Sequence, residues 1–228
     1  HSLGFGHPNT LGFWTLLLIF SGLLYNPGKG HRVMPCLISV LLAFCVFRVT
    51  DSKAALLSSL AAIVLCLIAF RAGPWLSSKK WSVPLCLGLY LLGIAAFLSL
   101  ALLYREDNGF FSTCNVLLSD RLAYSSAALR SFGVKLFGAQ INFRWDPVDS
   151  LYAYAPICMG LIPTALYFGL SLISLYRAAR AGRWDIVAIA FAGALYSTME
   201  YGLMNPVHLP IFAACARLKV EKDRKSSV

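Results

Sequence analysis

The stretch that decides the fold is VPLCLGLYLLGIAAFLSLALLY, residues Val83 to Tyr104, which contains no charged side chain. A helix crosses the hydrocarbon core of a bilayer with about 20 mostly apolar residues, and this stretch has that length. The whole chain of 228 residues is 58% hydrophobic and only 13% charged. Soluble domains are about 45–50% apolar and roughly a quarter charged. The composition therefore excludes an ordinary soluble domain, a disordered chain and a small disulfide-rich protein.

Five further stretches resemble this one in length and apolar character, and a seventh is shorter. The predicted spans are residues 10–25, 33–49, 54–72, 83–104, 151–176 and 186–203, with the short one at 206–216. Gly, Pro and charged residues separate them, as in tight connections. We therefore predict an all-α integral membrane protein, a multispan helical bundle with six or seven transmembrane helices in a single membrane domain, residues 1–228.

The charged residues lie between the apolar stretches, which favours a role in membrane orientation over nucleic-acid binding. Of the 20 Lys and Arg residues, 13 fall in one set of alternate connections together with the tail, residues 217–228. This set includes Arg177, Arg180 and Arg183, which we interpret as a cytoplasmic anchor. The long connection at residues 105–150 and the segment before the first span are then extracytoplasmic. We expect no signal peptide, because no basic segment precedes the first apolar stretch.

The long outer connection is predicted to contain a helix. Leu118, Leu122, Leu129, Phe132 and Leu136 recur at helical spacing and form one apolar stripe. We interpret it as an interfacial helix that lies on the membrane. Arg121 falls at the edge of the stripe, within reach of lipid headgroup phosphates.

Common metal and cofactor motifs are absent from the sequence. No two of the seven cysteines have the C-x-x-C spacing, and there is no phosphate-binding loop, HExxH or G-x-S-x-G motif. Six of the cysteines lie in or beside apolar stretches and are expected to pack as small hydrophobic residues. We predict no metal site and no cofactor.

Polar residues at membrane depth are costly and are therefore candidate site residues. Glu200 lies near the outer end of the sixth predicted span, and Asn205 and His208 follow it. They either form an interfacial helix end or line an outward-facing cavity. His7 and Asn9 precede the first span, where Pro8 can start a helix and Asn9 can cap it. His7 is either solvated or able to titrate or donate to an anionic ligand.

The segment before the fifth span, residues 142–150, mixes aromatic side chains with Arg144, Asp146 and Asp149. Aromatic residues are typical of membrane interfaces whatever the function. An Arg beside two carboxylates is equally typical of a rim that binds sugar or phosphate. The sequence leaves both interpretations open.

Four segments together resemble a known family. They are SLGFGHPNTLG (Ser2 to Gly12), NVLLSDRLAYSSAALRSFGVKLFG (Asn115 to Gly138), VDSLYAYAPICMGLIP (Val148 to Pro163) and TMEYGLMN (Thr198 to Asn205). In this order and spacing the chain resembles the middle and C-terminal part of Wzy-type polysaccharide polymerases, within the O-antigen ligase and polymerase superfamily. Members of that family usually have about ten or more spans, so the resemblance implies that an N-terminal part is missing here.

The resemblance implies a bacterial inner-membrane glycosyltransferase. Such enzymes join oligosaccharide repeat units carried on undecaprenyl pyrophosphate, for O-antigen, capsule or exopolysaccharide, without a nucleotide sugar or an obligatory metal. Expected partners are the lipid-linked substrate, membrane lipid, a chain-length regulator and a flippase. An O-antigen ligase, a transporter of lipid-linked sugars and a structural membrane subunit are the alternatives.

Roles for individual residues follow from this expected chemistry. An Arg can stabilise the pyrophosphate leaving group, with Arg121 the first choice and Arg144 the second. The general base is expected among Asp149, Glu200 and His7. The residues expected to bind the sugars are Asn9, Asp146, Asn205 and His208.

Overall fold

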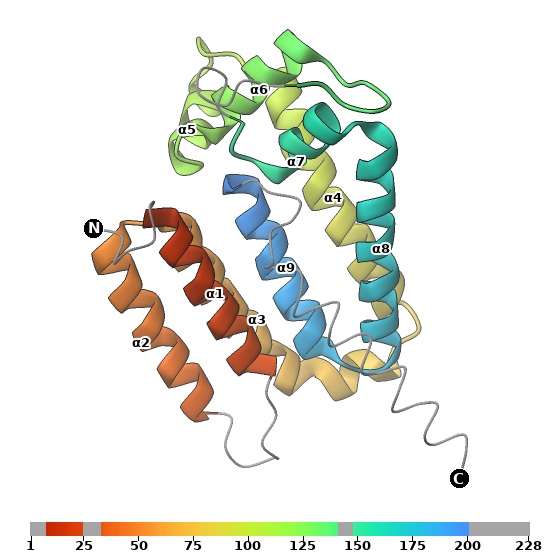
Figure 1. The fold of residues 1–228 in the computed structure, drawn as a ribbon. Coiled ribbons are helices and arrows are strands. Elements are labelled where there is room, and N and C mark those ends of the chain that lie inside the picture. Colours follow the sequence, from red (N-terminus) through yellow and green to blue (C-terminus); the bar gives the residue numbers. More distant parts are fainter. Residues whose placement is uncertain (1–7, 25–32, 141–147, 201–228) are drawn as a thin grey trace. The chain divides into compact units, whose positions relative to one another are not determined.

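The fold was taken from a computed structural model, which describes residues 8–24, 33–140 and 148–200 (Figure 1). Within these residues all regular structure is helical. The helices are α1 (Pro8–Leu24), α2 (Val33–Thr50), α3 (Lys53–Ser78), α4 (Ser82–Leu103), α5 (Gly109–Leu117), α6 (Arg121–Phe132), α7 (Leu151–Tyr154), the π-helix η1 (Ala155–Met159), α8 (Leu161–Arg180) and α9 (Trp184–Met199). This confirms the predicted all-α class.

Four of the described helices are long and apolar enough to cross a bilayer, namely α2, α3, α4 and α8. Helices α1 and α9 are apolar but shorter. The helices match the predicted spans closely for 10–25, 33–49 and 83–104, because long apolar stretches with at most one charged residue define where a helix begins and ends. The short span predicted at 206–216 and the basic tail lie outside the described residues.

The described residues form two compact units. The first contains residues 8–24, 33–86 and 173–196, and the second contains residues 87–140, 148–172 and 197–200. In the first unit α1, α2 and α3 pack against one another. Gly12 on α1 allows this close approach, because a Cβ there would lie 3.0 Å from Oγ of Ser52 and 3.1 Å from Cβ of Ala55.

The fifth predicted span, residues 151–176, is not one continuous helix. It begins as α7, widens into η1, and breaks at Gly160, which has φ +94°. Pro156 lies in η1 and has no backbone N–H to donate, and the Gly160 N–H donates to the carbonyl of Ala155, five residues back. The continuous apolar composition concealed this break, since hydropathy does not register a change in backbone direction.

The connection between α4 and α7 contains two helices, α5 and α6, and the apolar stripe on α6 faces protein. Leu122 and Leu129 are buried in a core of the second unit that includes Ala101, Val148 and Ile157. Leu136 lies beyond the end of α6, which stops at Phe132 before Gly133 at φ +62°. The predicted interfacial helix is therefore wrong in its orientation, because an apolar stripe is equally suited to a lipid surface and to a protein core.

Candidate functional site

The candidate site is an ion-pair cluster in the second unit, centred on Arg121. The Nη1 atom of Arg121 lies 3.0 Å from Oδ2 of Asp149, and Nη2 lies 3.7 Å from Oε1 of Glu200. The Nε–H donates to the carbonyl of Met199 at 2.9 Å, and Nη1 donates to the carbonyl of Ser119 at 3.3 Å. One guanidinium thus joins the start of α6, the segment just before α7 and the residue after α9.

Among the described residues, one guanidinium in this cluster faces two carboxylates. All three side chains are largely shielded, with exposed fractions of 21% for Arg121, 24% for Asp149 and 13% for Glu200. Glu200 follows the last residue of α9 and lies outside the four candidate membrane helices. The pKa of Glu200 is raised to about 7. Burial is the main cause, the charge of Asp149 also raises it, and Arg121 offsets part of the rise. Near neutral pH this carboxyl group can therefore accept or release a proton.

A strained turn places Arg121 at the start of its helix. Ser119 and Asp120 have φ values of +51° and +65°, in the left-handed region that non-glycine residues seldom occupy. The buried Asn115 holds this turn, since its Oδ1 accepts from the Ala123 N–H at 2.9 Å and its Nδ2 donates to Oδ1 of Asp120 at 2.9 Å. The Asp120 N–H donates to the carbonyl of Asn115 at 2.9 Å. Asn115 therefore fixes the direction in which Arg121 leaves the backbone.

Ser150 anchors the segment that carries Asp149. It is fully buried, its Oγ donates to the carbonyl of Ser197 at 3.2 Å, and the same Oγ accepts from the Tyr152 N–H at 3.3 Å as the N-cap of α7. The Leu151 N–H donates to the carbonyl of Glu200 at 3.2 Å. These bonds tie the backbone beside Asp149 to the backbone around Glu200, so both carboxylates are held at Arg121.

The structure brings three of the predicted site residues together, namely Arg121, Asp149 and Glu200. Asn9 is the second residue of α1 and belongs to the first unit. The other predicted site residues lie outside the described residues: His7, Arg144, Asp146, Asn205 and His208. Sequence reasoning missed Asn115 and Ser150 as supporting residues. Ser150 was detectable as a Ser directly before an apolar run, whereas nothing local distinguishes Asn115.

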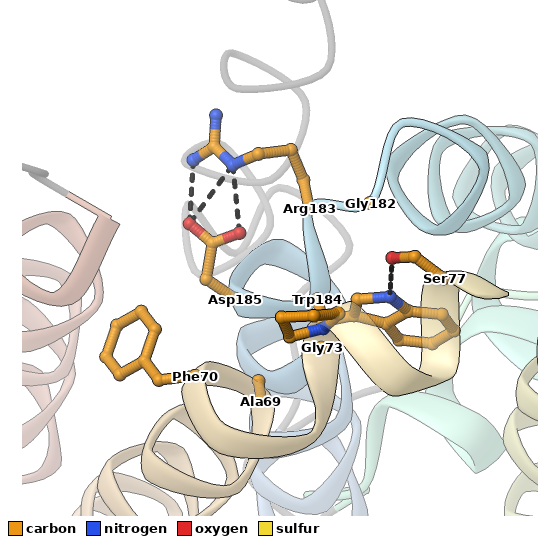
Figure 2. Close-up of a pocket in the computed structure, with 9 residues that line it drawn as sticks. Ala69, Phe70, Gly73, Ser77, Gly182, Arg183, Trp184 and Asp185 are labelled. Atoms are coloured by element: carbon orange, nitrogen blue, oxygen red, sulfur yellow. Dashed lines mark hydrogen bonds and ion pairs between the residues drawn. The ribbon is translucent and has the colours of Figure 1, made fainter. Parts of the chain in front are cut away.

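A second ionic group lies in the first unit, at the turn between α8 and α9. Figure 2 shows Arg183 and Asp185 facing each other beside a cavity of about 260 Å³. Arg183 Nη2 lies 2.7 Å from Oδ2 of Asp185, and its Nε lies 2.9 Å from Oδ1. The indole N–H of Trp184 donates to Oγ of Ser77 at 2.9 Å, which joins this turn to α3. None of the described residues that line this cavity is a predicted catalytic residue.

The Arg121 cluster offers an anion-binding group and a proton acceptor in one place. The 3.7 Å approach to Glu200 is longer than a hydrogen bond, so an oxygen of an anionic ligand can replace that contact. Within the part of the chain that the structure describes, no group of three or more His, Cys, Asp or Glu side chains is suited to a metal ion. The arrangement is therefore chemically suited to bind a phosphate oxygen and to move a proton nearby.

Comparison of the chain with protein-family models, with curated proteins and with solved structures finds no match.

Proposed function

We propose that the protein is a polysaccharide polymerase that joins lipid-linked oligosaccharide repeat units by glycosyl transfer. The observation that carries the proposal is the placement of Arg121 between Asp149 and Glu200, at 3.0 Å and 3.7 Å. These are residues from three of the four segments that resemble the Wzy-type family. A cation beside a carboxyl group of pKa about 7 supplies the two groups that this reaction requires.

In the proposed reaction a sugar hydroxyl of the acceptor attacks the anomeric carbon of the donor. The new C–O bond forms as the bond from that carbon to the pyrophosphate breaks, and the pyrophosphate leaves with the bonding electrons. Arg121 stabilises the negative charge on the leaving group through paired N–H donors. The hydroxyl proton passes to the carboxylate of Glu200, and Asp149 holds the guanidinium in place.

The proposed setting is the outer face of the bacterial cytoplasmic membrane. In addition to the four candidate spans, α1, α9 and the short 206–216 segment are proposed as shorter crossings. This gives six or seven membrane crossings in total. The basic connections and tail face the cytoplasm under the positive-inside rule. Residues 105–150, with Arg121 and Asp149, are then extracytoplasmic.

The proposed substrates are two undecaprenyl-pyrophosphate-linked oligosaccharides, one as donor and one as acceptor. A flippase that delivers these units and a regulator of chain length are the proposed partners. The chemistry needs neither a nucleotide sugar nor a metal, because the pyrophosphate is already an activated leaving group and Arg121 neutralises its charge.

The test is gel analysis of surface polysaccharide from cells that lack the full-length protein and are complemented with variants. Wild type should restore a ladder of polymer lengths, and Arg121→Ala should leave single repeat units at equal protein level. The matched control is Arg130→Ala, on the same helix, whose side chain is exposed and donates from Nη2 to the carbonyl of Tyr104 at 2.6 Å. If Arg121→Ala and Arg130→Ala both keep the full ladder, Arg121 is not catalytic.

The same experiment separates a polymerase from a ligase. Loss of a ligase leaves long polymer on its lipid carrier and removes it from the cell surface. Loss of a polymerase leaves no long polymer anywhere. Analysis of the carrier-linked fraction beside the surface fraction therefore distinguishes the two activities.

One observation favours a transporter of lipid-linked sugars as a second candidate. The α7–η1–α8 segment is a broken helix, and broken helices often form the substrate sites of transporters. Transporters of that kind usually carry a second broken helix in a related half, and the sequence shows no internal repeat. Polymer synthesis by purified protein from lipid-linked units in detergent, where transport is impossible, would exclude transport as its only function.

A further inference from the structure

The loop that follows α6 exposes a cluster of apolar side chains. Between Gly133 and Gly138 the exposed fractions are 50% for Val134, 59% for Leu136 and 79% for Phe137. Large apolar side chains gathered on one exposed loop mark a contact with a protein or a membrane. The loop belongs to the second unit throughout.

This loop caps the start of α8. The Leu161 N–H donates to the carbonyl of Lys135 at 2.8 Å, and the Ile162 N–H approaches the carbonyl of Leu136 at 3.3 Å. The first amides of a helix have no acceptor within the helix, so acceptors from another segment stabilise this end. The apolar loop is therefore held beside the first turn of α8.

The loop is held in position because the backbones at Gly138 and Gly160 lie directly against each other at its base. Gly138 has φ +80° and Gly160 has φ +94°. A Cβ on Gly138 would collide with the carbonyl of Cys158, and a Cβ on Gly160 would collide with the backbone of Gly138 and Leu136. The Ala139 N–H donates to the carbonyl of Ile157 at 2.8 Å. The loop cannot swing away from α8 without breaking these contacts.

Helix α8 is a candidate membrane span whose apolar part is short. It runs from Leu161 to Tyr176, and Arg177 follows in the last turn. At 1.5 Å per residue this part measures about 24 Å, whereas the hydrocarbon core is about 30 Å thick. Leu161, Ile162 and Leu166 are exposed at its beginning. The apolar loop adds surface beyond the first turn, where the helix alone falls short.

We infer that Val134, Leu136 and Phe137 insert into the acyl region of the bilayer beside the start of α8. The partner is bilayer lipid, because the loop continues the exposed apolar surface of a membrane-spanning helix and is fixed to it by backbone bonds. Lys135, which is exposed, extends to the headgroup phosphates. The membrane contact that the sequence predicted for the stripe on α6 is thus made by the loop that follows it. This inference does not depend on the proposed glycosyl transfer.

The test uses Phe137→Trp in the full chain, reconstituted into phosphatidylcholine vesicles with or without bromine on the acyl chains. Bromine quenches only tryptophan that lies within the acyl region. The signal of the added tryptophan is the difference between the variant and the parent protein, which contains five native Trp residues. Leu136→Trp is the second variant, and Asp107→Trp, at an exposed site in the turn before α5, is the control.

Insertion predicts that the signals added at 136 and 137 are lost in brominated vesicles, whereas the signal added at 107 is retained. Signals at 136 and 137 that are quenched no more than the control would overturn the inference. Blue-shifted fluorescence that depends on protein concentration and resists bromine would assign the loop to contact between copies of the chain, which also overturns it. A cell-based loss of polymer would not bear on either result.

Discussion

The molecule has two clusters in which an arginine contacts carboxylates, and the two differ in where the carboxylates come from. Arg183 pairs with Asp185, two residues along the same turn, through contacts of 2.7 Å and 2.9 Å that use both carboxylate oxygens. Arg121 pairs with Asp149 and Glu200, which other segments deliver, at 3.0 Å and 3.7 Å. The first pair is local and uses both carboxylate oxygens, whereas in the second, among the described residues, one guanidinium contacts two carboxylates from other segments.

This difference separates a structural pair from a reactive one. A matched pair at a turn fixes the chain direction. In the shielded cluster around Arg121, burial raises the pKa of Glu200 to about 7, and the charge of Asp149 contributes to this rise. Perturbed titratable groups of this kind gather at functional sites. The Arg121 cluster is therefore the better candidate for chemistry.

The largest expected effect is the loss of activity on removing Arg121, compared with removing Arg183. Arg121→Ala should lower the rate of polymer formation by about 10²–10³-fold, because a donor to the developing charge is lost. Arg183→Ala should leave that rate close to wild type. The measurement is the initial rate of polymer formation by purified protein from lipid-linked repeat units. Equal losses in the two variants would contradict the assigned difference.

The next effect concerns the pH dependence at Glu200. A general base must be ionised, so wild-type activity should rise as the pH passes through about 7, the pKa of this carboxyl group. Glu200→Gln should be slower by about 10²-fold and should lose that rise. The rate is measured between pH 5 and pH 9 in both proteins. An unchanged profile in the variant would assign the base to another residue.

The same carboxyl group has a predicted effect on stability. Its folded pKa lies above the ordinary value of 4.5, so its protonated form stabilises the fold and this contribution is lost as the pH rises from 4.5 through about 7. The melting temperature of wild type should fall over that range more than that of Glu200→Gln. Thermal unfolding in detergent at pH 5 and pH 8 measures the difference. A larger fall in the Gln variant would have the wrong sign.

A smaller effect tests the turn that aims Arg121. Asn115→Ala removes the acceptor of the Ala123 N–H and a donor to Asp120, and should destabilise the second unit by about 1–3 kcal/mol. Asn115→Asp keeps the acceptor but places an oxygen instead of the donor 2.9 Å from Oδ1 of Asp120, so it should not recover the lost stability. Denaturant unfolding beside the polymer-formation assay measures both variants. Wild-type stability in Asn115→Ala would show that the turn needs no side-chain support.

The smallest effect is expected for the local pair. Arg183→Ala should change the free energy of unfolding by about 0–1 kcal/mol, since the arginine side chain is partly exposed and its partner lies only two residues along the same turn. Thermal unfolding of the variant and of Asp185→Ala measures it. A loss of several kcal/mol would mean that the pair supports the fold as strongly as a buried one.

The position of the helices could be predicted from sequence, but their interruption could not. Hydropathy located the stretch at Val83 to Tyr104 because nearly every residue in it is apolar. It treated 151–176 in the same way, although Gly160 divides that stretch. The apolar stripe of α6 was also identified, but its environment was not, because burial in protein and burial in lipid require the same side chains.

Three members of the candidate site were predicted one by one, and their assembly was not. Glu200 is predicted because charged groups at membrane depth are costly, Arg121 because it lies at the edge of an apolar stripe, and Asp149 because its segment combines an Arg with carboxylates. Their sequence positions carry no sign that one guanidinium contacts both carboxylates. Asn115 was missed because its role depends on a left-handed turn at Ser119 and Asp120, which sequence patterns do not reveal.

The sequence by itself determined that this chain is helical and apolar enough for a membrane, because hydropathy and charge act residue by residue and need no tertiary context. Only the tertiary structure decided which charges meet. The pairing of Arg121 with two distant carboxylates depends on hydrogen bonds from the Ser150 hydroxyl and the Leu151 N–H to the end of α9. The raised pKa of Glu200, which follows from burial and from the nearby charge of Asp149, exists only once those segments are held together.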